Sequence, residues 1–450
     1  MQNRISSLDE RTNEYVTGTS PAGAAAVRSR PNVVSIAVWA ICAIAVILIY
    51  SAIWRTAPFH GTDTADYIDS ARDIAAGIDK PEPRTPGFPL FLLLVGTGRA
   101  YFVVSMALHL AAVGLLAWVL LSIQVSKRLV ALFAAVAVLP PFMQKDAYLL
   151  TEGLAEFLMV AGVAGLWLRR GSVVQAALSG LAFALATITR PQNQLLPILI
   201  AILMVMYFGW KLGRKYAFAL LAPFVILVGG LVLHNAVKFG YPSLTYLLGH
   251  HLGTKTVSLF DDIPDKQVRD IMVSVRNDAY VHRNPYWTTW YTRETLMKVK
   301  DMTPVQLAKY MQKIHMHLIL THPLAYVEEF LRTFARFWLP DAPAQTNHGA
   351  ILRLVSLGTQ LALCIAFWFI FVFWAGLLLG RLVLPIPEWL PQVDVRFLYT
   401  TAMLVIFYTA ALGSALDIGE PRYRSAVDLV ILFVIVVTAH FLGKQRARNA

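Results

Sequence analysis

Residues 33–53 read VVSIAVWAICAIAVILIYSAI and contain no charged side chain. A helix needs about 20 mostly apolar residues to cross the hydrocarbon core of a bilayer, so this stretch is long enough to span a membrane. The rest of the chain has the same character: 57% of its 450 residues are hydrophobic, 15% are charged, and the mean hydropathy is +0.57. This composition excludes an ordinary soluble globular protein.

Further apolar runs follow along the chain. They predict an all-α polytopic membrane protein, because backbone polar groups in lipid must be satisfied within each helix and the runs lack the alternation of barrel strands. We predict ten spans, at about 33–53, 101–122, 128–143, 152–168, 173–189, 193–208, 216–236, 354–379, 397–416 and 426–442.

Basic residues fall on one side of this ten-span arrangement. The clusters that define the side include Lys127 with Arg128, Lys211 with Arg214 and Lys215, and Lys444 with Arg446 and Arg448. Lys and Arg favour cytoplasmic loops, so both termini are predicted to be cytoplasmic. The net charge of +12 is attributed to this sidedness and to contact with anionic lipid, and no nucleic-acid binding is predicted. The compact outer face favours a bacterial inner membrane.

The predicted spans divide the chain into five parts. These are a cytoplasmic disordered tail at 1–32, a transmembrane module at 33–236 with a first outer loop at 54–100, a long outer loop at 237–353, C-terminal spans at 354–442 and a cytoplasmic tail at 443–450. In the long loop we predict helices around 265–281 and 293–320. The stretch at 323–339 carries four charged residues and is predicted to be an interfacial amphipathic helix rather than a span.

Polar residues gather in the predicted outer loops. Charged groups at the membrane surface are costly unless they are paired or face a watery cavity, so a cluster contributed by separate loops indicates a functional site. The candidates are Asp63, Asp66, Tyr67 and Arg84 in the first outer loop, Lys145 and Glu152 in the second, Arg190 in the third, and Glu420, Arg422, Tyr423 and Arg424 in the last.

Several candidates also have a purely structural interpretation. Asp63 precedes a helical pattern and is equally suited to be an N-cap. Arg84 precedes Thr85 and Pro86, which suit the end of a loop. Arg190 is followed by Pro191 and suits an interfacial helix end, and Glu152 suits the start of a helix, where a negative charge favours the helix dipole.

Motifs for cofactors are not found. The only cysteines, Cys42 and Cys364, both lie in predicted spans and indicate no disulfide framework. The pair His250–His251 has no third ligand at a recognisable spacing for zinc. P-loop, dinucleotide and HExxH motifs are absent from the sequence. No cofactor and no metal site is therefore predicted, and the sequence leaves the dependence on a divalent metal open.

The order of the polar motifs carries a resemblance. After the first span comes a loop with an acidic residue, Tyr67 and Pro86-Gly87-Phe88-Pro89, and then Leu150-Thr151-Glu152, Thr189-Arg190-Pro191 and Glu420-Pro421-Arg422-Tyr423-Arg424 before the last span. This order resembles the GT-C superfamily of integral-membrane glycosyltransferases, in particular the branch of protein O-mannosyltransferases and lipid A aminoarabinose transferases. The resemblance covers most of the chain.

The resemblance implies transfer of a sugar from a polyprenyl-phosphate donor to a lipid, glycan or protein acceptor on the extracytoplasmic face, with inversion at the anomeric carbon. Asp63 matches the acidic position of the first loop and would be the general base. That branch tends to carry an Asp-Glu pair there, whereas here Thr64 follows Asp63, so Asp66 is the second candidate. Cations would bind the lipid phosphate, and the candidates are Arg190, Arg422 and Arg424, with Lys145 or Arg84. Four further residues would complete the substrate site: Tyr67, Glu152, Glu420 and Tyr423.

Two other functions remain open. A transporter or flippase of lipid-linked sugars should show ionisable residues near the bilayer midplane and two related halves. The acidic residues instead gather at one face, and the sequence shows no internal repeat. A transferase resembling O-antigen ligases would rely on a long outer loop such as 237–353. The aromatic run 286–291 in that loop suits either interfacial anchoring or stacking on a sugar.

Overall fold

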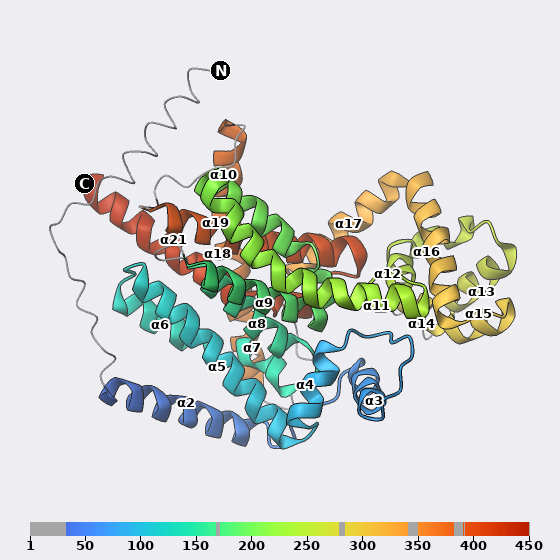
Figure 1. Ribbon diagram of the computed structural model, residues 1–450, viewed down its shortest axis with the longest axis horizontal. Coiled ribbons are helices and arrows are strands. Elements are labelled where there is room, and N and C mark those ends of the chain that lie inside the picture. Colours follow the sequence, from blue (N-terminus) through green and yellow to red (C-terminus); the bar gives the residue numbers. More distant parts are fainter. Residues whose placement is uncertain are drawn as a thin grey trace. The chain divides into compact units, whose positions relative to one another are not determined.

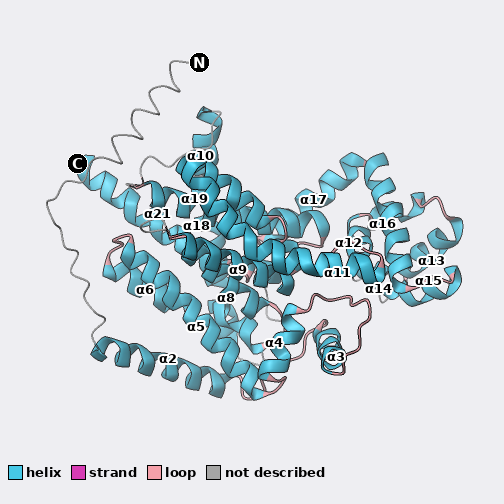
Figure 2. Cartoon of the chain, in the orientation of Figure 1, coloured by secondary structure: helices cyan, strands magenta, loops and turns pink. Residues whose placement is uncertain are grey.

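A computed structural model describes residues 33–449 apart from 168–171, 279–283, 341–349, 382–389 and 391. The predicted tail at 1–32 lies outside these residues. Every regular element described is a helix, as Figures 1 and 2 show, and the only β-type pairing among the described residues is an isolated bridge between Phe59 and Tyr148. The predicted all-α class is therefore confirmed. The chain from Ile47 onward forms one compact unit.

Ten α-helices are described between Val33 and Phe239. They are α2 (Val33–Ile53), α3 (Thr64–Ala75), α4 (Gly87–Val95), α5 (Arg99–Ser122), α6 (Lys127–Ala137), α7 (Pro140–Met143), α8 (Glu152–Gly165), α9 (Val173–Thr189), α10 (Leu196–Phe224) and α11 (Gly230–Phe239). Ten more follow in the described part of the chain. They are α12 (Leu248–Lys255), α13 (Lys266–Asn277), α14 (Thr288–Tyr291), α15 (Arg293–Lys300), α16 (Pro304–Thr321), α17 (Pro323–Phe337), α18 (Ala350–Arg381), α19 (Val393–Leu416), α20 (Pro421–Arg424) and α21 (Asp428–Asn449).

Five helical stretches among the described residues are long and apolar enough to cross a membrane. These are Arg99–Ser122, Pro191–Phe239, Leu354–Val372, Val393–Leu416 and Asp428–Ala447. A sixth results if α6 and Pro140–Ala147, which meet at an angle of 58°, are one bent span. The helices Ala37–Ile53 and Val173–Thr189 are apolar but shorter. The count of ten spans stays a prediction.

The stretch Pro191–Phe239 turns back on itself at Gly209. As one straight helix its 49 residues would be about 73 Å long, more than twice the hydrocarbon thickness of a bilayer. Gly209 has φ 70° and ψ 168°, a conformation that glycine adopts without strain. A Cβ on Gly213 would lie 2.5 Å from the Met204 carbonyl oxygen, although a straight helix would place these residues about 13 Å apart. The turn falls between the predicted spans at 193–208 and 216–236.

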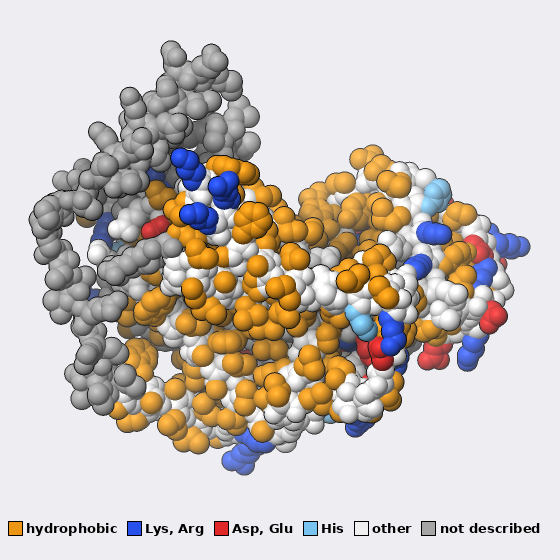
Figure 3. All heavy atoms as spheres, in the orientation of Figure 1, with side chains coloured by type: hydrophobic (Ala, Val, Ile, Leu, Met, Phe, Trp, Pro, Cys, Tyr) orange, Lys and Arg blue, Asp and Glu red, His pale blue; other side chains and the backbone are white. Residues whose placement is uncertain are grey.

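The main core lies between the apolar helices. α5 packs on α8, α8 on α9, α9 on α10, α10 on α19 and α19 on α21 (Figure 1). Side chains such as Leu116, Phe183, Met204 and Phe397 are buried in one hydrophobic cluster there. Large apolar side chains also remain exposed, and Figure 3 shows hydrophobic atoms covering much of the visible face over α5, α10 and α11. Such a surface suits contact with lipid.

Helices α13, α15 and α16 and the 3-10 segment Val257–Asp262 form a second, smaller core, which contains Phe260, Met272 and Met311. The predicted helix at 265–281 is observed as α13, and its last predicted residues lie outside the described ones. The predicted helix at 293–320 is divided into α15 and α16, because Thr303 caps α16 with a capping box and Pro304 occupies the first turn. α17 has 15 residues and is not among the candidate spans.

Candidate functional site

The loop that carries Asp63 is fixed by the loop that precedes α8. The Phe59 N–H donates to the Ala147 carbonyl at 2.7 Å, and the Leu149 N–H donates to the Phe59 carbonyl at 2.9 Å. The Thr64 hydroxyl then donates to the Leu149 carbonyl at 2.9 Å. These three hydrogen bonds hold the start of α3, and with it Asp63, beside the N-terminus of α8.

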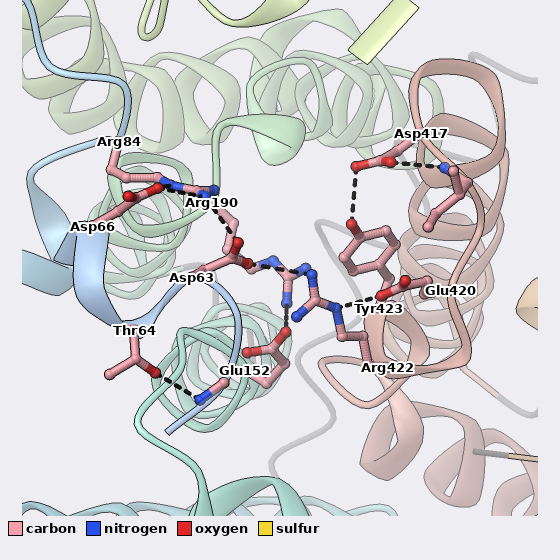
Figure 4. A network of polar contacts seen from close by, with 12 residues as sticks. Asp63, Thr64, Asp66, Arg84, Glu152, Arg190, Asp417, Glu420, Arg422 and Tyr423 are labelled. Atoms are coloured by element: carbon pink, nitrogen blue, oxygen red, sulfur yellow. Dashed lines mark hydrogen bonds and ion pairs between the residues drawn. The ribbon is translucent and has the colours of Figure 1, made fainter. Parts of the chain in front are cut away.

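Asp63 is held by two arginines from distant parts of the chain (Figure 4). Its Oδ1 accepts a hydrogen bond from Arg84 Nη2 at 2.8 Å, and its Oδ2 accepts one from Arg422 Nη2 at 3.2 Å. Asp63 occupies the N-cap position of α3, but its side chain makes no capping hydrogen bond. The orientation of the Asp63 side chain is therefore explained by its two ion pairs and not by helix capping.

Arg84 joins both acidic residues of the first loop. In addition to Asp63, it donates to Asp66 Oδ2 from Nε at 3.1 Å and from Nη2 at 3.0 Å. Its guanidinium lies 5.3 Å from the centre of the Tyr67 ring, within cation–π range. Tyr67 is buried and packs edge-on against Phe88, with ring centres 4.9 Å apart. The Asp66 side chain is 50% exposed, against 17% for Asp63.

Arg190 ends α9 and points its side chain toward α8. Its backbone is extended, with φ −136° and ψ 106°, because the following Pro191 disfavours the helical conformation. Arg190 Nη1 lies 3.4 Å from Glu152 Oε1 in the first turn of α8. Nevertheless, Arg190 Nη1 and Glu152 Oε2 are buried and have no hydrogen-bond partner. Leaving a buried charged group unsatisfied is costly, so this pair is suited to receive a polar ligand.

The segment between α19 and α21 completes the cluster. Arg422 also pairs with Glu420 at 2.7 Å. The guanidinium groups of Arg190 and Arg422 lie 5.2 and 5.3 Å from the centre of the Tyr423 ring, so one aromatic ring contacts two cations. The Tyr423 hydroxyl donates to Asp417 Oδ2 at 2.9 Å.

Asp417 connects the cluster to the long loop, because its Oδ2 lies 3.1 Å from His251 Nδ1 of α12. Neither residue was among the candidates from the sequence. Asp417 had a signal, since it is a carboxylate placed directly after an apolar run. His251 had a signal only as half of the pair His250–His251, which lacks a third zinc ligand in the sequence.

The electrostatic environment differs among the carboxylates. Burial alone would raise the pKa of Asp63, but the charges and hydrogen bonds of Arg84 and Arg422 outweigh it and lower this pKa. The pKa of Asp417 is lowered as well, because His251, the Ile418 N–H and Tyr423 outweigh the effect of burial. The pKa of Glu420 is raised, mainly by burial, despite its pairing with Arg422.

Three cavities meet at this cluster. The first, of about 210 Å³, has Leu244, Leu247, Leu412 and Leu416 in its wall together with Arg190, and we name it the leucine cavity. The second, of about 460 Å³, is lined by Trp287, Trp290, Arg293 and His251 among others, and we name it the tryptophan cavity. The third, of about 470 Å³, is lined by Lys145, Pro141, Gln360 and Arg424 among others, and we name it the lysine cavity.

Arg422 borders all three cavities. Asp63 borders the leucine and tryptophan cavities, and Glu152 borders the leucine and lysine cavities. The charged cluster therefore lies where the three cavities adjoin. Two molecules that occupied neighbouring cavities would meet at Asp63 and Arg422.

Two predicted site residues lie apart from the cluster. Lys145 Nζ pairs with Glu156 Oε2 at 3.0 Å and contacts the Phe142 carbonyl. Arg424 is 1% exposed and donates to Asp428 Oδ1 at 2.9 Å and to the Leu339 carbonyl at 2.7 Å. Both line the lysine cavity, but these contacts give both cations structural partners and do not support the predicted role in binding substrate.

A buried ionisable group that was not among the predicted site residues lies between α5 and α8. His109 Nδ1 lies 2.8 Å from Glu156 Oε2, and His109 Nε2 lies 2.9 Å from the Ala137 carbonyl oxygen. Nearby, the Ser105 hydroxyl donates to Asp146 Oδ1 at 3.0 Å. The signal was Glu156 itself, because a carboxylate inside an apolar run is expensive and is usually paired.

Within the described parts of the chain, no three His, Cys, Asp or Glu side chains are placed to hold a metal ion together. The chain matches no known protein-family model, no curated protein and no solved structure. Fold and site together define an all-helical protein with helices of membrane-spanning length, whose candidate site is a cluster of arginines and carboxylates between three cavities.

Proposed function

We propose that the protein is a membrane glycosyltransferase that moves a sugar from a polyprenyl-phosphate donor to an acceptor hydroxyl on the extracytoplasmic face. The observation that carries this proposal is the Asp63 carboxylate, held between Arg84 and Arg422 where the cavities meet. Glycosyl transfer from a phosphate needs a base for the acceptor proton and cations for the leaving group, both within one site. This cluster contains both.

The leucine cavity suits the donor. Its leucines come from α19 and from the segment before α12, and its polar end contains Arg190, Arg84 and Arg422. Arg190 is the best candidate to bind the phosphate, because its buried Nη1 has no hydrogen-bond partner. The planar guanidinium can donate two parallel hydrogen bonds to phosphate oxygens. A lipid phosphate carries an apolar chain next to an anion. The leucines and arginines of this cavity wall are suited to bind these two parts.

In the proposed step the acceptor oxygen attacks C1 of the donor sugar while the bond from C1 to the phosphate oxygen breaks. The acceptor proton passes to Asp63, and the electron pair of the broken bond leaves with the lipid phosphate. Arg190 and Arg422 stabilise the charge that develops on this phosphate. Asp63 is the base in this proposal, because it borders two cavities, whereas Asp66 borders only the tryptophan cavity and orients Arg84.

The proposal includes the ten-span arrangement of the GT-C superfamily, with cytoplasmic termini and an extracytoplasmic site in a bacterial inner membrane. The apolar helices, the basic residues on one predicted side and the order of the polar motifs support it. The proposal allows a lipid, a glycan or a protein as the acceptor.

The test is a transfer assay in membranes with a panel of radiolabelled polyprenyl-phosphate sugars. We expect wild type to release lipid phosphate and incorporate sugar. Asp63→Asn should lower the rate by about 10² to 10⁴, the usual contribution of a general base. Asp66→Asn should have a smaller effect, and Asp69→Asn is the matched control, since the exposed Asp69 side chain pairs with Arg72 on the same helix.

Full activity in Asp63→Asn would remove Asp63 as the base. Failure of the wild-type protein to consume any donor, in membranes where it is correctly inserted, would contradict the glycosyltransferase proposal.

One observation favours a second function, a transporter or flippase of lipid-linked sugars. His109, Lys145 and Glu156 form a buried ionisable cluster between apolar helices, as proton-coupled transporters require. Movement of intact lipid-linked sugar across proteoliposomes, lost in Glu156→Gln and without release of lipid phosphate, would favour this function over transfer.

A further inference from the structure

We infer that the tryptophan cavity is the acceptor site and that the acceptor is a carbohydrate. This inference rests on the proposed glycosyl transfer and narrows its acceptor class. It concerns helices α12, α14 and α15 of the predicted long outer loop, to which the proposed chemistry assigns no role.

The position of the cavity suits the acceptor. The tryptophan and leucine cavities share Asp63, Arg84 and Arg422 in their walls, so they adjoin at the same charged cluster. An inverting displacement needs the nucleophile and the leaving phosphate on opposite sides of C1. A hydroxyl that enters from the tryptophan cavity would reach Asp63 opposite a phosphate bound near Arg190.

The aromatic side chains suit a sugar ring. Trp287, Trp290 and Tyr286 line the cavity. Trp290 stacks on His250 with ring centres 5.4 Å apart and is contacted edge-on by His251 at 5.5 Å, so its orientation is fixed. Trp287 borders both the tryptophan and the lysine cavity. The face of an indole carries negative charge density and attracts the positively polarised axial C–H groups of a pyranose.

The polar side chains of the wall suit hydroxyl groups. Asp66, Glu294, Asp417 and Glu420 provide carboxylate acceptors, and Arg293 provides donors. A carboxylate that accepts from neighbouring hydroxyls and an aromatic face below the ring together recognise a pyranose. An acyl chain would place apolar groups against these charges without any new hydrogen bond and is therefore a poor match.

A peptide is matched less well than a sugar. An extended peptide is usually held by the free backbone edge of a strand. None of the described residues that line this cavity belongs to a strand, and those from helices α12, α14 and α15 have backbone groups that are largely bonded within the helix.

Binding can be tested on the purified full-length protein by saturation-transfer NMR. The probes are methyl α-mannopyranoside, methyl β-galactopyranoside and chitobiose, with a Ser/Thr-rich peptide as the competing class. We expect saturation transfer to at least one saccharide and none to the peptide. Trp287→Ala should weaken saccharide binding about tenfold, and Trp287→Phe should restore part of it. Glu294→Gln tests an exposed position that cannot disturb packing.

Trp118→Ala is the matched control, because Trp118 is 50% exposed on α5 and borders none of the three cavities. It should bind saccharides as wild type does. The inference is overturned if no saccharide binds, if the peptide alone binds, or if Trp287→Ala and Glu294→Gln both leave saccharide affinity unchanged.

The failure of this inference is distinguishable from failure of the proposed function. If wild type consumes a polyprenyl-phosphate donor in an Asp63-dependent manner but binds no saccharide, the glycosyltransferase proposal stands and the acceptor inference falls. If saccharides bind in a Trp287-dependent manner and no donor is consumed, the cavity binds sugar and the transfer proposal falls.

Discussion

The carboxyl group of Asp63 experiences two opposing effects, because burial favours its neutral form and two arginines favour its charged form. The arginines prevail, and its pKa is lowered. The sequence identified Asp63, Arg84 and Arg422 individually, since charged residues are conspicuous in an apolar chain. It could not pair them, because Asp63 and Arg422 are 359 positions apart and short-range patterns carry no information on such contacts.

The lowered pKa predicts the acid limit of activity. With the base already ionised well below neutral pH, the acid limb of the kcat/KM profile should lie below the usual carboxyl range of about 4. Arg84→Gln removes one cation and should move this limb to higher pH. The ion pairs also stabilise the fold above the unfolded pKa of about 3.9, and this contribution is lost as pH falls through the folded value.

The measurement is the pH profile of transfer for wild type, Arg84→Gln and Arg72→Gln. Arg72 is exposed, pairs with the exposed Asp69 and serves as the control; the acid limb of Arg72→Gln should coincide with that of wild type. An unmoved limb in Arg84→Gln would mean that a group other than Asp63 titrates.

At the scale of helices, the first loop is positioned by a close contact between α4 and α9. A Cβ on Gly87 would lie 2.6 Å from the Ile188 carbonyl oxygen, and the Thr85 hydroxyl donates to the Thr189 carbonyl at 3.2 Å. These contacts place Arg84 near Arg190. The sequence contained the motif Pro-Gly-Phe-Pro, but it did not show that Gly87 in this motif allows α4 to approach α9 closely.

Gly87→Ala should therefore destabilise the protein by about 1–3 kcal/mol, the usual cost of overpacking, and should also lower transfer activity. The new Cβ would clash with the Ile188 carbonyl, which belongs to the backbone of α9 and cannot move aside as a side chain can. Thermal unfolding in detergent, followed by circular dichroism, measures the effect.

Gly114→Ala is the control within α5, since a Cβ there meets nothing within 4 Å. Alanine is the better helix former by about 1 kcal/mol, so this variant should be as stable as wild type or more stable. Equal stability of both variants would show that the approach of α4 to α9 is not tight in solution.

For the whole molecule, the proposed function requires that α13 and its neighbours face the exterior and that the start of α6 faces the cytoplasm. Figure 3 shows acidic and basic side chains together over α13 and α15, whereas the face over the long helices is mainly apolar. The apolar composition predicted the class of fold, but the side on which each loop lies follows only from the bias of Lys and Arg.

Cysteine labelling tests this arrangement in a background with Cys42→Ser and Cys364→Ser. Asp270→Cys, at an exposed position of α13, should react with a membrane-impermeant maleimide on intact cells. Arg128→Cys, near the start of α6, should react only after permeabilisation. Labelling in the reverse pattern would place the candidate site on the cytoplasmic side.

The sequence by itself determined the all-helical class, the approximate apolar segments and most of the charged residues of the candidate site. These properties depend on local composition and on the cost of placing charge next to lipid. Both can be judged from a short segment of sequence without knowledge of the rest of the chain. Only the tertiary structure decided that Asp63 is shared by two arginines, that Lys145 and Arg424 have structural partners, and that Asp417 and His251 join the cluster. Those outcomes depend on the packing of helices, which brings distant residues within hydrogen-bond distance.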